Sequence, residues 1–200
     1  KLCLLTTFLS VATISCDDWT EMEIHDSQVN GFKEQNPQEY AVYTQNLRAY
    51  KATKHAVVYA RLDNAPEVST GEKDFLRALP DSIDIVTMRN ADRLSEYDRE
   101  DMKLVREDYG TKVLFYIDCT AKDKLNTSIT SAVEAVRAGT FDGIALGSEG
   151  SAVDVSALKS LLDALGQTPC LLVFEGTPSL LPEAQRSLFN YFVLDISGAS

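Results

Sequence analysis

The sequence predicts an α/β protein built on a parallel sheet, and three observations lead to that fold class. From His55 onward, short apolar segments alternate with segments of helical periodicity, as in successive strand–helix units. The strand segments are nearly continuous apolar runs, which is typical of strands covered on both faces. No glycine-rich phosphate loop follows any strand segment, and this counts against a nucleotide-binding open sheet. A barrel of the (β/α)8 type is therefore favoured over a doubly wound sheet.

The first predicted element along the chain is a helix from Pro37 to about Thr53. Asn36 serves as its cap, and Pro37 occupies the first helical position. Four side chains recur on one stripe of this helix: Tyr40, Tyr43, Leu47 and Tyr50. Such a stripe favours packing against a core, with a sugar-binding platform as the less favoured alternative.

Six strands and four further helices follow. The strands are expected within residues 55–65, 83–91, 111–119, 141–148, 169–176 and 191–200. The helices are expected over residues 95–110, 122–138, 153–165 and 182–189. Ser95 can cap the first of these helices, and Gly110, Gly139 and Gly166 end the first three. Because a closed barrel needs eight such units in about 250 residues, the sequence predicts the first six units of a longer barrel.

Polar side chains come directly after the strand segments. The carboxyl ends of barrel strands meet at one mouth and build its site, so we expect these side chains to lie near one another. The candidate glycan-binding residues at this mouth are Asp63, Asn64, Arg89, Asn90, Asp118, Glu149, Glu175 and Asp195.

Composition and charge exclude several functions. The chain is 44% hydrophobic and 24% charged, which is ordinary for a globular domain. Its net charge of -11 argues against nucleic acid and against adsorption to anionic lipid through a basic face. His25 and His55 have no Cys or His close by in sequence, so no metal and no cofactor are expected. Cys119 and Cys170 lie in apolar runs, as two buried small side chains or as a disulfide, and the sequence leaves both open.

The N-terminal region is predicted to be an export and lipid-anchoring segment rather than part of the folded domain. Residues 1–15 suit a secretory signal peptide, because their apolar run is too short to span a bilayer as a helix. Residues 13–16 (TISC) resemble a lipobox, in which Cys16 becomes the acylated first residue of the mature chain. Residues 16–36 would then form a tether, and residues 37–200 the incomplete barrel domain.

The segment FDGIALGSE, residues 141–149, resembles the fourth barrel strand of glycoside hydrolase family 18, whose pattern is D-G-x-D-x-D-x-E. This is the chitinase and endo-β-N-acetylglucosaminidase family. The TISC box, the DDW after it, the helix YAVYTQNLRAYKATKH and the strand end LDNA resemble family-18-like lipoproteins of Bacteroidota glycan-utilisation loci. The resemblance implies a lipid-anchored protein on the surface of the outer membrane. It also implies a glycan as ligand and an outer-membrane glycan transporter as partner.

Residue by residue, the resemblance is incomplete at the site. Asp142 and Gly143 match the first Asp and the Gly, and Glu149 matches the catalytic acid. Ala145 and Gly147 stand where the family has Asp. In the family the substrate's own acetamide is the nucleophile, the Glu protonates the leaving oxygen, and the Asp two residues before it orients the acetamide. Asp142 and Glu149 are therefore the catalytic candidates that remain.

These residues predict a surface glycan-binding lipoprotein built on a catalytically inactive family 18 barrel, which aids glycan capture and utilisation. The alternative is an active endo-β-N-acetylglucosaminidase or chitinase-like hydrolase with Glu149 as general acid. A purely structural partner of an outer-membrane transporter is a third class that the sequence leaves open.

Overall fold

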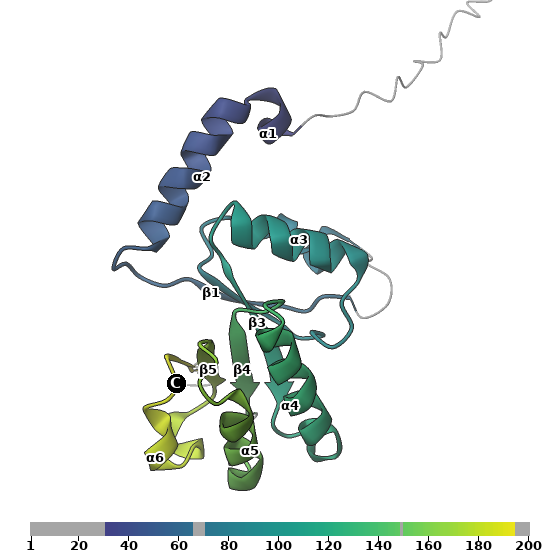
Figure 1. Ribbon diagram of the computed structural model, residues 1–200, viewed down its shortest axis with the longest axis vertical. Coiled ribbons are helices and arrows are strands. Elements are labelled where there is room, and N and C mark those ends of the chain that lie inside the picture. Colours follow the sequence, from purple (N-terminus) through teal and green to yellow (C-terminus); the bar gives the residue numbers. More distant parts are fainter. Residues whose placement is uncertain (1–30, 66–70, 149, 195–200) are drawn as a thin grey trace, which may run out of the picture. The chain divides into compact units, whose positions relative to one another are not determined.

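The computed structural model describes residues 31–65, 71–148 and 150–194. Within them, six parallel strands are hydrogen-bonded in the order β1-β2-β3-β4-β5-β6. The sheet curls into half of a barrel, with helices in the connections between strands (Figure 1). The predicted α/β fold of barrel type is confirmed.

Each predicted segment contains its element, and the observed element is shorter in nearly every case. The strands are β1 (Tyr59–Leu62), β2 (Ile85–Met88), β3 (Lys112–Asp118), β4 (Gly143–Gly147), β5 (Leu171–Glu175) and β6 (Tyr191–Val193). The main helices are α2 (Pro37–Lys51), α3 (Glu96–Glu107), α4 (Lys122–Arg137), α5 (Val155–Leu165) and α6 (Glu183–Arg186). The described connection between β1 and β2 holds two 3-10 turns, η1 (Glu72–Asp74) and η2 (Leu76–Ala78), and no α-helix.

The chain divides into two compact units after Pro37. Of the first unit, the structure describes the short helix α1 (Phe32–Gln35) and its flanking residues. The predicted signal peptide (1–15), the lipidated Cys16 and most of the tether (16–36) lie outside the described residues and stay predictions. No helix in the described part of the chain has the length and apolar character that a membrane span requires.

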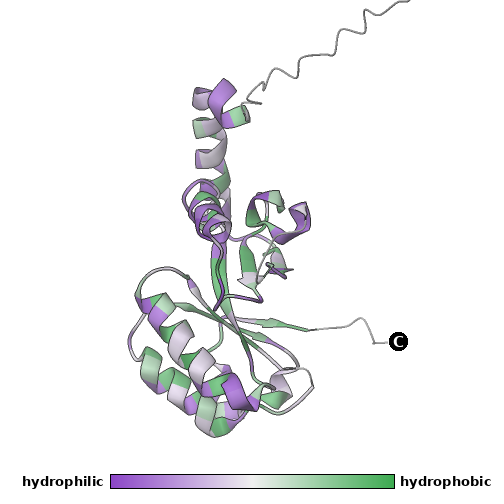
Figure 2. Ribbon diagram, turned by 90° about the vertical axis from the view of Figure 1, so that its right-hand side faces the viewer, coloured by the Kyte–Doolittle hydropathy of each residue, from purple (hydrophilic) through white to green (hydrophobic). Residues whose placement is uncertain are grey.

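Apolar side chains cover both faces of the sheet, and this is the reason for the continuous apolar runs in the sequence. The outward-facing side chains pack under the helices in one large cluster, which includes Val86, Val113 and Ile144. A smaller cluster fills the inner face of the curl: Ile85, Leu114, Tyr116, Ala145 and Val173. In Figure 2 the strands are largely hydrophobic, whereas the helices alternate between hydrophobic and hydrophilic residues.

The tyrosine stripe on α2 is not core packing, so the favoured interpretation of that stripe is wrong. Thr44 is the buried residue of α2, while Tyr43 and Tyr50 are 44% and 55% exposed. The hydroxyls find partners instead: Tyr40 donates to Asp108 at 2.7 Å, and Tyr43 donates to Asp81. Hydrogen bonds to acceptors on neighbouring loops therefore hold this face of α2, with little apolar burial.

An ionisable pair joins the loop before β1 to the residue that precedes β2, Asp84. Nε2 of His55 lies 2.9 Å from Asp84 Oδ1, and its Nδ1 lies 2.8 Å from the Thr53 carbonyl oxygen. A carbonyl and a carboxylate only accept, so both ring nitrogens donate when the imidazole is protonated. The hydrogen bond to Asp84, supported by the one to Thr53, raises the pKa of His55.

We therefore expect the folded state to lose stability as the pH rises through the raised pKa of His55. The contribution is fully present below the unfolded-state pKa of about 6.5 and disappears above the folded-state value. Urea unfolding of the full chain at a series of pH values measures this, with His55→Gln as the matched variant. The difference in unfolding free energy between wild type and variant should shrink as pH rises. A difference that is constant with pH would contradict the assignment.

Candidate functional site

A pocket of 410 Å³ lies at the carboxyl ends of the strands, where a barrel carries its site. We call it the mouth pocket. Its polar lining comes from β1, β3 and β5 and from the segments that follow β2, β4 and β5: Arg61, Arg89, Tyr116, Ser148, Glu175 and Thr177.

Glu175, the last residue of β5, is held from the far side of the curl. Its side chain is 2% exposed and lies 2.8 Å, through Oε2, from Nε of Arg61 on β1. Its Oε1 accepts a hydrogen bond from the hydroxyl of Tyr59, which also contacts Thr87. Burial and the bond to Glu175 raise the pKa of Tyr59, so this hydroxyl keeps its proton. Both carboxylate oxygens of Glu175 are therefore engaged by β1.

The ring of Tyr116 occupies the space beside Gly147, the last residue of β4. A Cβ at Gly147 would overlap the hydroxyl oxygen of Tyr116 and lie 2.5 Å from ring carbons Cε2 and Cζ. The guanidinium of Arg89 lies over the same ring, 4.1 Å from its centroid. A side chain at position 147 would therefore require the Tyr116 ring to move, because the ring fills the place of a side chain there.

Ala145 is likewise surrounded. It is fully buried and belongs to the inner apolar cluster with Leu114 and Val173. Of the two positions at which the family motif has Asp, Ala145 thus lies in the packed interior, whereas Gly147 lies where that interior meets the mouth pocket.

Of the candidates predicted from sequence, the structure brings Arg89 and Glu175 together in the mouth pocket. Glu149 and Asp195 lie outside the described residues, so their predicted roles stay predictions. The remaining candidates are engaged in loop structure.

Asn64 and Asn90 fasten the loops after β1 and β2 to each other. Asn64 is fully buried, and its Oδ1 accepts from the backbone N–H of Asn90 at 3.0 Å. Asn90 donates through Nδ2 to Asp63 Oδ1 and to the Asn64 carbonyl. Asp118 accepts from the backbone and hydroxyl of Thr120 in the turn after β3. None of these four candidates lines the mouth pocket.

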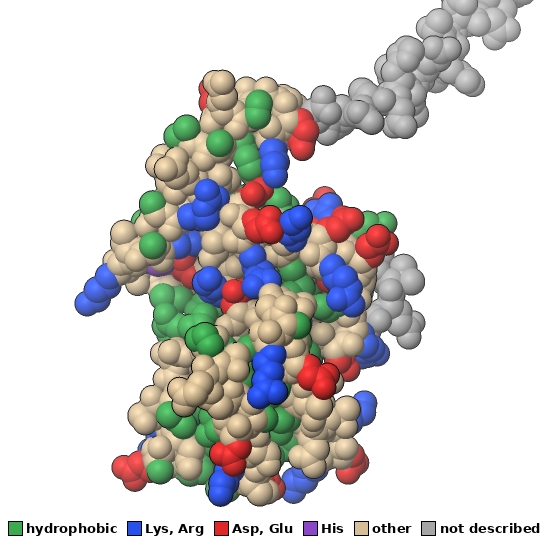
Figure 3. Space-filling view, viewed as in Figure 1, with side chains coloured by type: hydrophobic (Ala, Val, Ile, Leu, Met, Phe, Trp, Pro, Cys, Tyr) green, Lys and Arg blue, Asp and Glu red, His purple; other side chains and the backbone are tan. Residues whose placement is uncertain are grey.

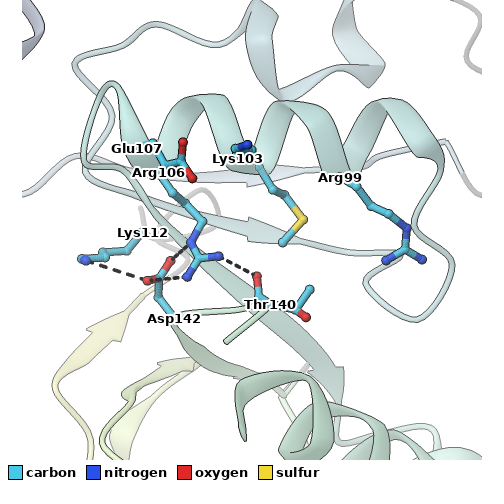
Figure 4. Close-up of a pocket in the computed structure, with 8 residues that line it drawn as sticks. Arg99, Lys103, Arg106, Glu107, Lys112, Thr140 and Asp142 are labelled. Atoms are coloured by element: carbon cyan, nitrogen blue, oxygen red, sulfur yellow. Dashed lines mark hydrogen bonds and ion pairs between the residues drawn. The ribbon is translucent and has the colours of Figure 1, made fainter. Parts of the chain in front are cut away.

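Asp142, predicted as a catalytic candidate, precedes β4 and therefore lies at the opposite end of the strand from the mouth. Its carboxylate accepts hydrogen bonds from Nε and Nη2 of Arg106, at 2.9 and 3.2 Å, and from the backbone N–H of Val113 at 2.9 Å. Figure 4 shows this pair in a second pocket, of 570 Å³, with Lys112 beside it. The geometry gives Asp142 a structural part, joining α3, β3 and β4, and places it outside the lining of the mouth pocket.

The surface around α3 carries interspersed charges of both signs (Figure 3). The second pocket belongs to this surface, and long charged side chains line it, among them Arg99, Lys103 and Glu107. Cys119 and Cys170 are free thiols, and burial raises the pKa of Cys119 to about 12, so it stays protonated. Among the described residues, no three His, Cys, Asp or Glu side chains are grouped as a metal site.

Sequence reasoning missed Arg61 and Tyr116, although both were within reach of a simple rule. Side chains of a strand alternate between its two faces. Arg61 lies two residues before Asp63, and Tyr116 two before Asp118, so each shares a face with a residue that had been singled out. On β1 and β3, the polar residue inside the strand lines the pocket, and the one at or just after the end of the strand does not.

The curled parallel sheet and the polar pocket at its carboxyl ends define the class of protein, an α/β barrel-type protein with its site in the usual position. Comparison with family models then identifies the family. The model of glycoside hydrolase family 18, BT1044-like, matches residues 20–138, and the chain belongs to this family. The matched region ends before β4, so membership rests on the first half of the fold and not on the catalytic motif.

Among solved structures, a glutamate-to-glutamine variant of BT1044 is similar to this chain, with a TM-score of 0.64 and 16% identity. The match covers 82% of this chain and 64% of that one, so this chain spans less than two thirds of it. The chitinase domain of the spore coat protein CotE from Clostridium difficile matches with a TM-score of 0.43 and 14% identity, over 72% and 50% of the two chains. No curated protein sequence matches. The family fold supports a glycan-binding or glycosidase-like function.

Because Asp142 has a structural part, we expect its substitution to lower the stability of the protein without changing ligand binding. Asp142→Ala leaves Arg106 without its carboxylate and the buried N–H of Val113 without an acceptor, which should cost roughly 2–4 kcal/mol of unfolding free energy. Glycan affinity should not change, because the residue lies at the other end of the barrel. Denaturant unfolding and calorimetric titration measure the two quantities.

Glu100→Ala is the matched control for this variant. Glu100 makes an exposed ion pair with Arg77 at 3.5 Å, and removing it should cost less than about 1 kcal/mol. If Asp142→Ala were no more destabilised than Glu100→Ala, the anchoring part assigned to Asp142 would be refuted.

Proposed function

We propose that this protein is a surface glycan-binding lipoprotein whose family 18 barrel does not hydrolyse its ligand. One observation supports this most directly: the ring of Tyr116 fills the space beside Gly147, where the family motif has the Asp that orients the acetamide. An Asp side chain has no room there while the ring stays in place.

The chemistry of the family makes this position decisive. The acetamide of the substrate acts as nucleophile only when it is oriented and its developing positive charge is stabilised. Losing one such transition-state contact costs a factor of roughly 100 to 1,000 in rate. Ala145 removes a second carboxylate from the same strand face. Glu149 could supply a proton, but no described residue takes the part of the missing Asp.

An active hydrolase with Glu149 as general acid is the second candidate. It would need another carboxylate to orient the acetamide, and Glu175 is the described one in the mouth pocket. Both oxygens of Glu175 are taken by Tyr59 and Arg61, and its side chain is buried. This engagement favours the binding function over the hydrolase.

The anchor and the partner complete the proposal. Cys16, which follows an apolar run and precedes Asp17 and Asp18, would be acylated and hold the protein at the outer-membrane surface. A glycan held at the mouth pocket could then pass to an outer-membrane glycan transporter. The sequence resemblance supports this part.

We expect the full-length protein to release no product from chitin oligosaccharides or N-glycan cores, while it binds such glycans. Binding should survive Glu149→Gln within about tenfold, because an amide can replace a carboxylate toward a sugar hydroxyl at a difference of roughly 1 kcal/mol. Product analysis by mass spectrometry and calorimetric titration give the two readouts. Turnover that is abolished in Glu149→Gln would overturn the proposal in favour of the hydrolase.

The complementary variant restores the motif. Ala145→Asp with Gly147→Asp should recover no hydrolysis and should lower stability, because the new side chains enter the packed interior around Tyr116. Rapid turnover by this double variant would show that the interior yields easily, which contradicts the packing argument.

We also expect Cys16 to carry lipid. Metabolic labelling of expressing cells with a palmitate analogue should mark the wild-type protein and not Cys16→Ala. Equal labelling of the two proteins would rule out the anchor at this residue.

A further inference from the structure

The described lining of the mouth pocket holds more cationic than anionic side chains. The whole sequence carries a net charge of -11, yet the charged residues that line the described pocket are two arginines, Arg61 and Arg89, and one carboxylate, Glu175. Arg61 and Glu175 are paired with each other. Of the described charged residues in the lining, Arg89 is therefore the one without an oppositely charged partner among them, while Glu149, which is predicted at the same mouth, lies outside the described residues.

Arg89 is held in place without a counter-ion among the described residues. Its guanidinium carbon lies 4.1 Å from the centroid of the Tyr116 ring in a cation–π contact, and it makes no ion pair with a described carboxylate. A cation–π contact does not use up the N–H donors of the guanidinium, which can still bind a ligand. The contact with Tyr116 thus holds the Arg89 guanidinium at the pocket, and its N–H groups can donate hydrogen bonds to a ligand.

Two of the acceptor side chains in the described lining, in contrast, already have partners. Tyr59 and Arg61 occupy both oxygens of Glu175. The hydroxyl of Ser148 donates to the carbonyl of Ser151. A pocket that offers donors and positive charge suits a ligand group that accepts hydrogen bonds and carries negative charge.

We propose that the mouth pocket selects acidic glycans, with Arg89 pairing a carboxylate or sulfate group of the bound sugar. A planar guanidinium matches either group through two parallel hydrogen bonds, which are stronger than bonds to a neutral hydroxyl. This inference rests on the proposed glycan-binding function and specifies its ligand class.

Three probes that share one core test the inference: N-acetyllactosamine, sialyl-N-acetyllactosamine and 6-sulfo-N-acetyllactosamine. Calorimetric titration of the full-length protein should show that at least one acidic probe binds roughly ten- to a hundredfold more tightly than the neutral one. The preference should fall as salt is raised. The two acidic probes distinguish a carboxylate-binding site from a sulfate-binding site.

Arg89→Met is the decisive variant, because it keeps an unbranched apolar stem over Tyr116 and removes the charge. It should abolish the preference, so that the acidic and neutral probes bind the variant with affinities within about twofold of each other. Arg99→Met, on the exposed surface of α3 and remote from the mouth, removes the same charge from the whole protein and should leave the preference unchanged.

Two outcomes would overturn the inference alone. They are equal affinity of the wild type for the neutral and both acidic probes, and equal loss of all binding in Arg89→Met while thermal unfolding shows the variant folded. In either case neutral glycan binding by the wild type would still support the proposed function. Binding of none of the three probes would count against the proposed function and this inference together.

Discussion

A buried carboxylate that must be paired connects the two sides of this half-barrel. Glu175 is 2% exposed, and an unpaired carboxylate at that depth would cost several kcal/mol. Its partners, Tyr59 and Arg61, come from β1, four strands away in the sheet. The sheet has to curl for β1 and β5 to meet at their carboxyl ends. The pairing of Glu175, the one described carboxylate of the mouth pocket, therefore requires the same curl of the sheet that shapes the pocket.

The residues of the family motif lie at both ends of β4, and the two ends have different roles: one in folding and one in chemistry. At the amino end, Asp142 binds Arg106 and the backbone of Val113, and a Cβ at Gly143 would overlap the carbonyl oxygen of Leu171 on β5. These two matches to the motif are explained by folding alone. At the carboxyl end, the positions whose duty in the family is chemical hold Ala145 and Gly147. Retention of the first half of the motif is thus no argument for activity.

Most of the fold could be predicted from the sequence, and about half of the candidate site could not. Strand and helix segments follow from periodicity, because both faces of the sheet are covered and the helices are amphipathic. The sequence placed three candidates at the correct ends of their strands: Asn64, Asn90 and Asp118. Their polar atoms, however, form hydrogen bonds within the loops and turns that follow the strands. A residue after a strand is polar whether it faces a ligand or another loop. Its partner lies on a loop some 26 positions away for Asn64, and local sequence does not reveal it.

Tyr116 explains why small residues at 145 and 147 are compatible with a well-packed interior. Protein interiors are packed to the density of organic crystals, so a position that lacks a side chain must be filled by a neighbour. The Tyr116 ring fills the place beside Gly147, and Arg89 covers the ring at the pocket surface. An Asp at 147 would collide with the ring, whereas a small residue at 116 would leave a cavity and remove the support of Arg89. The three residues therefore form one packing unit, and the arrangement that excludes the catalytic Asp is the same one that holds a cation at the mouth.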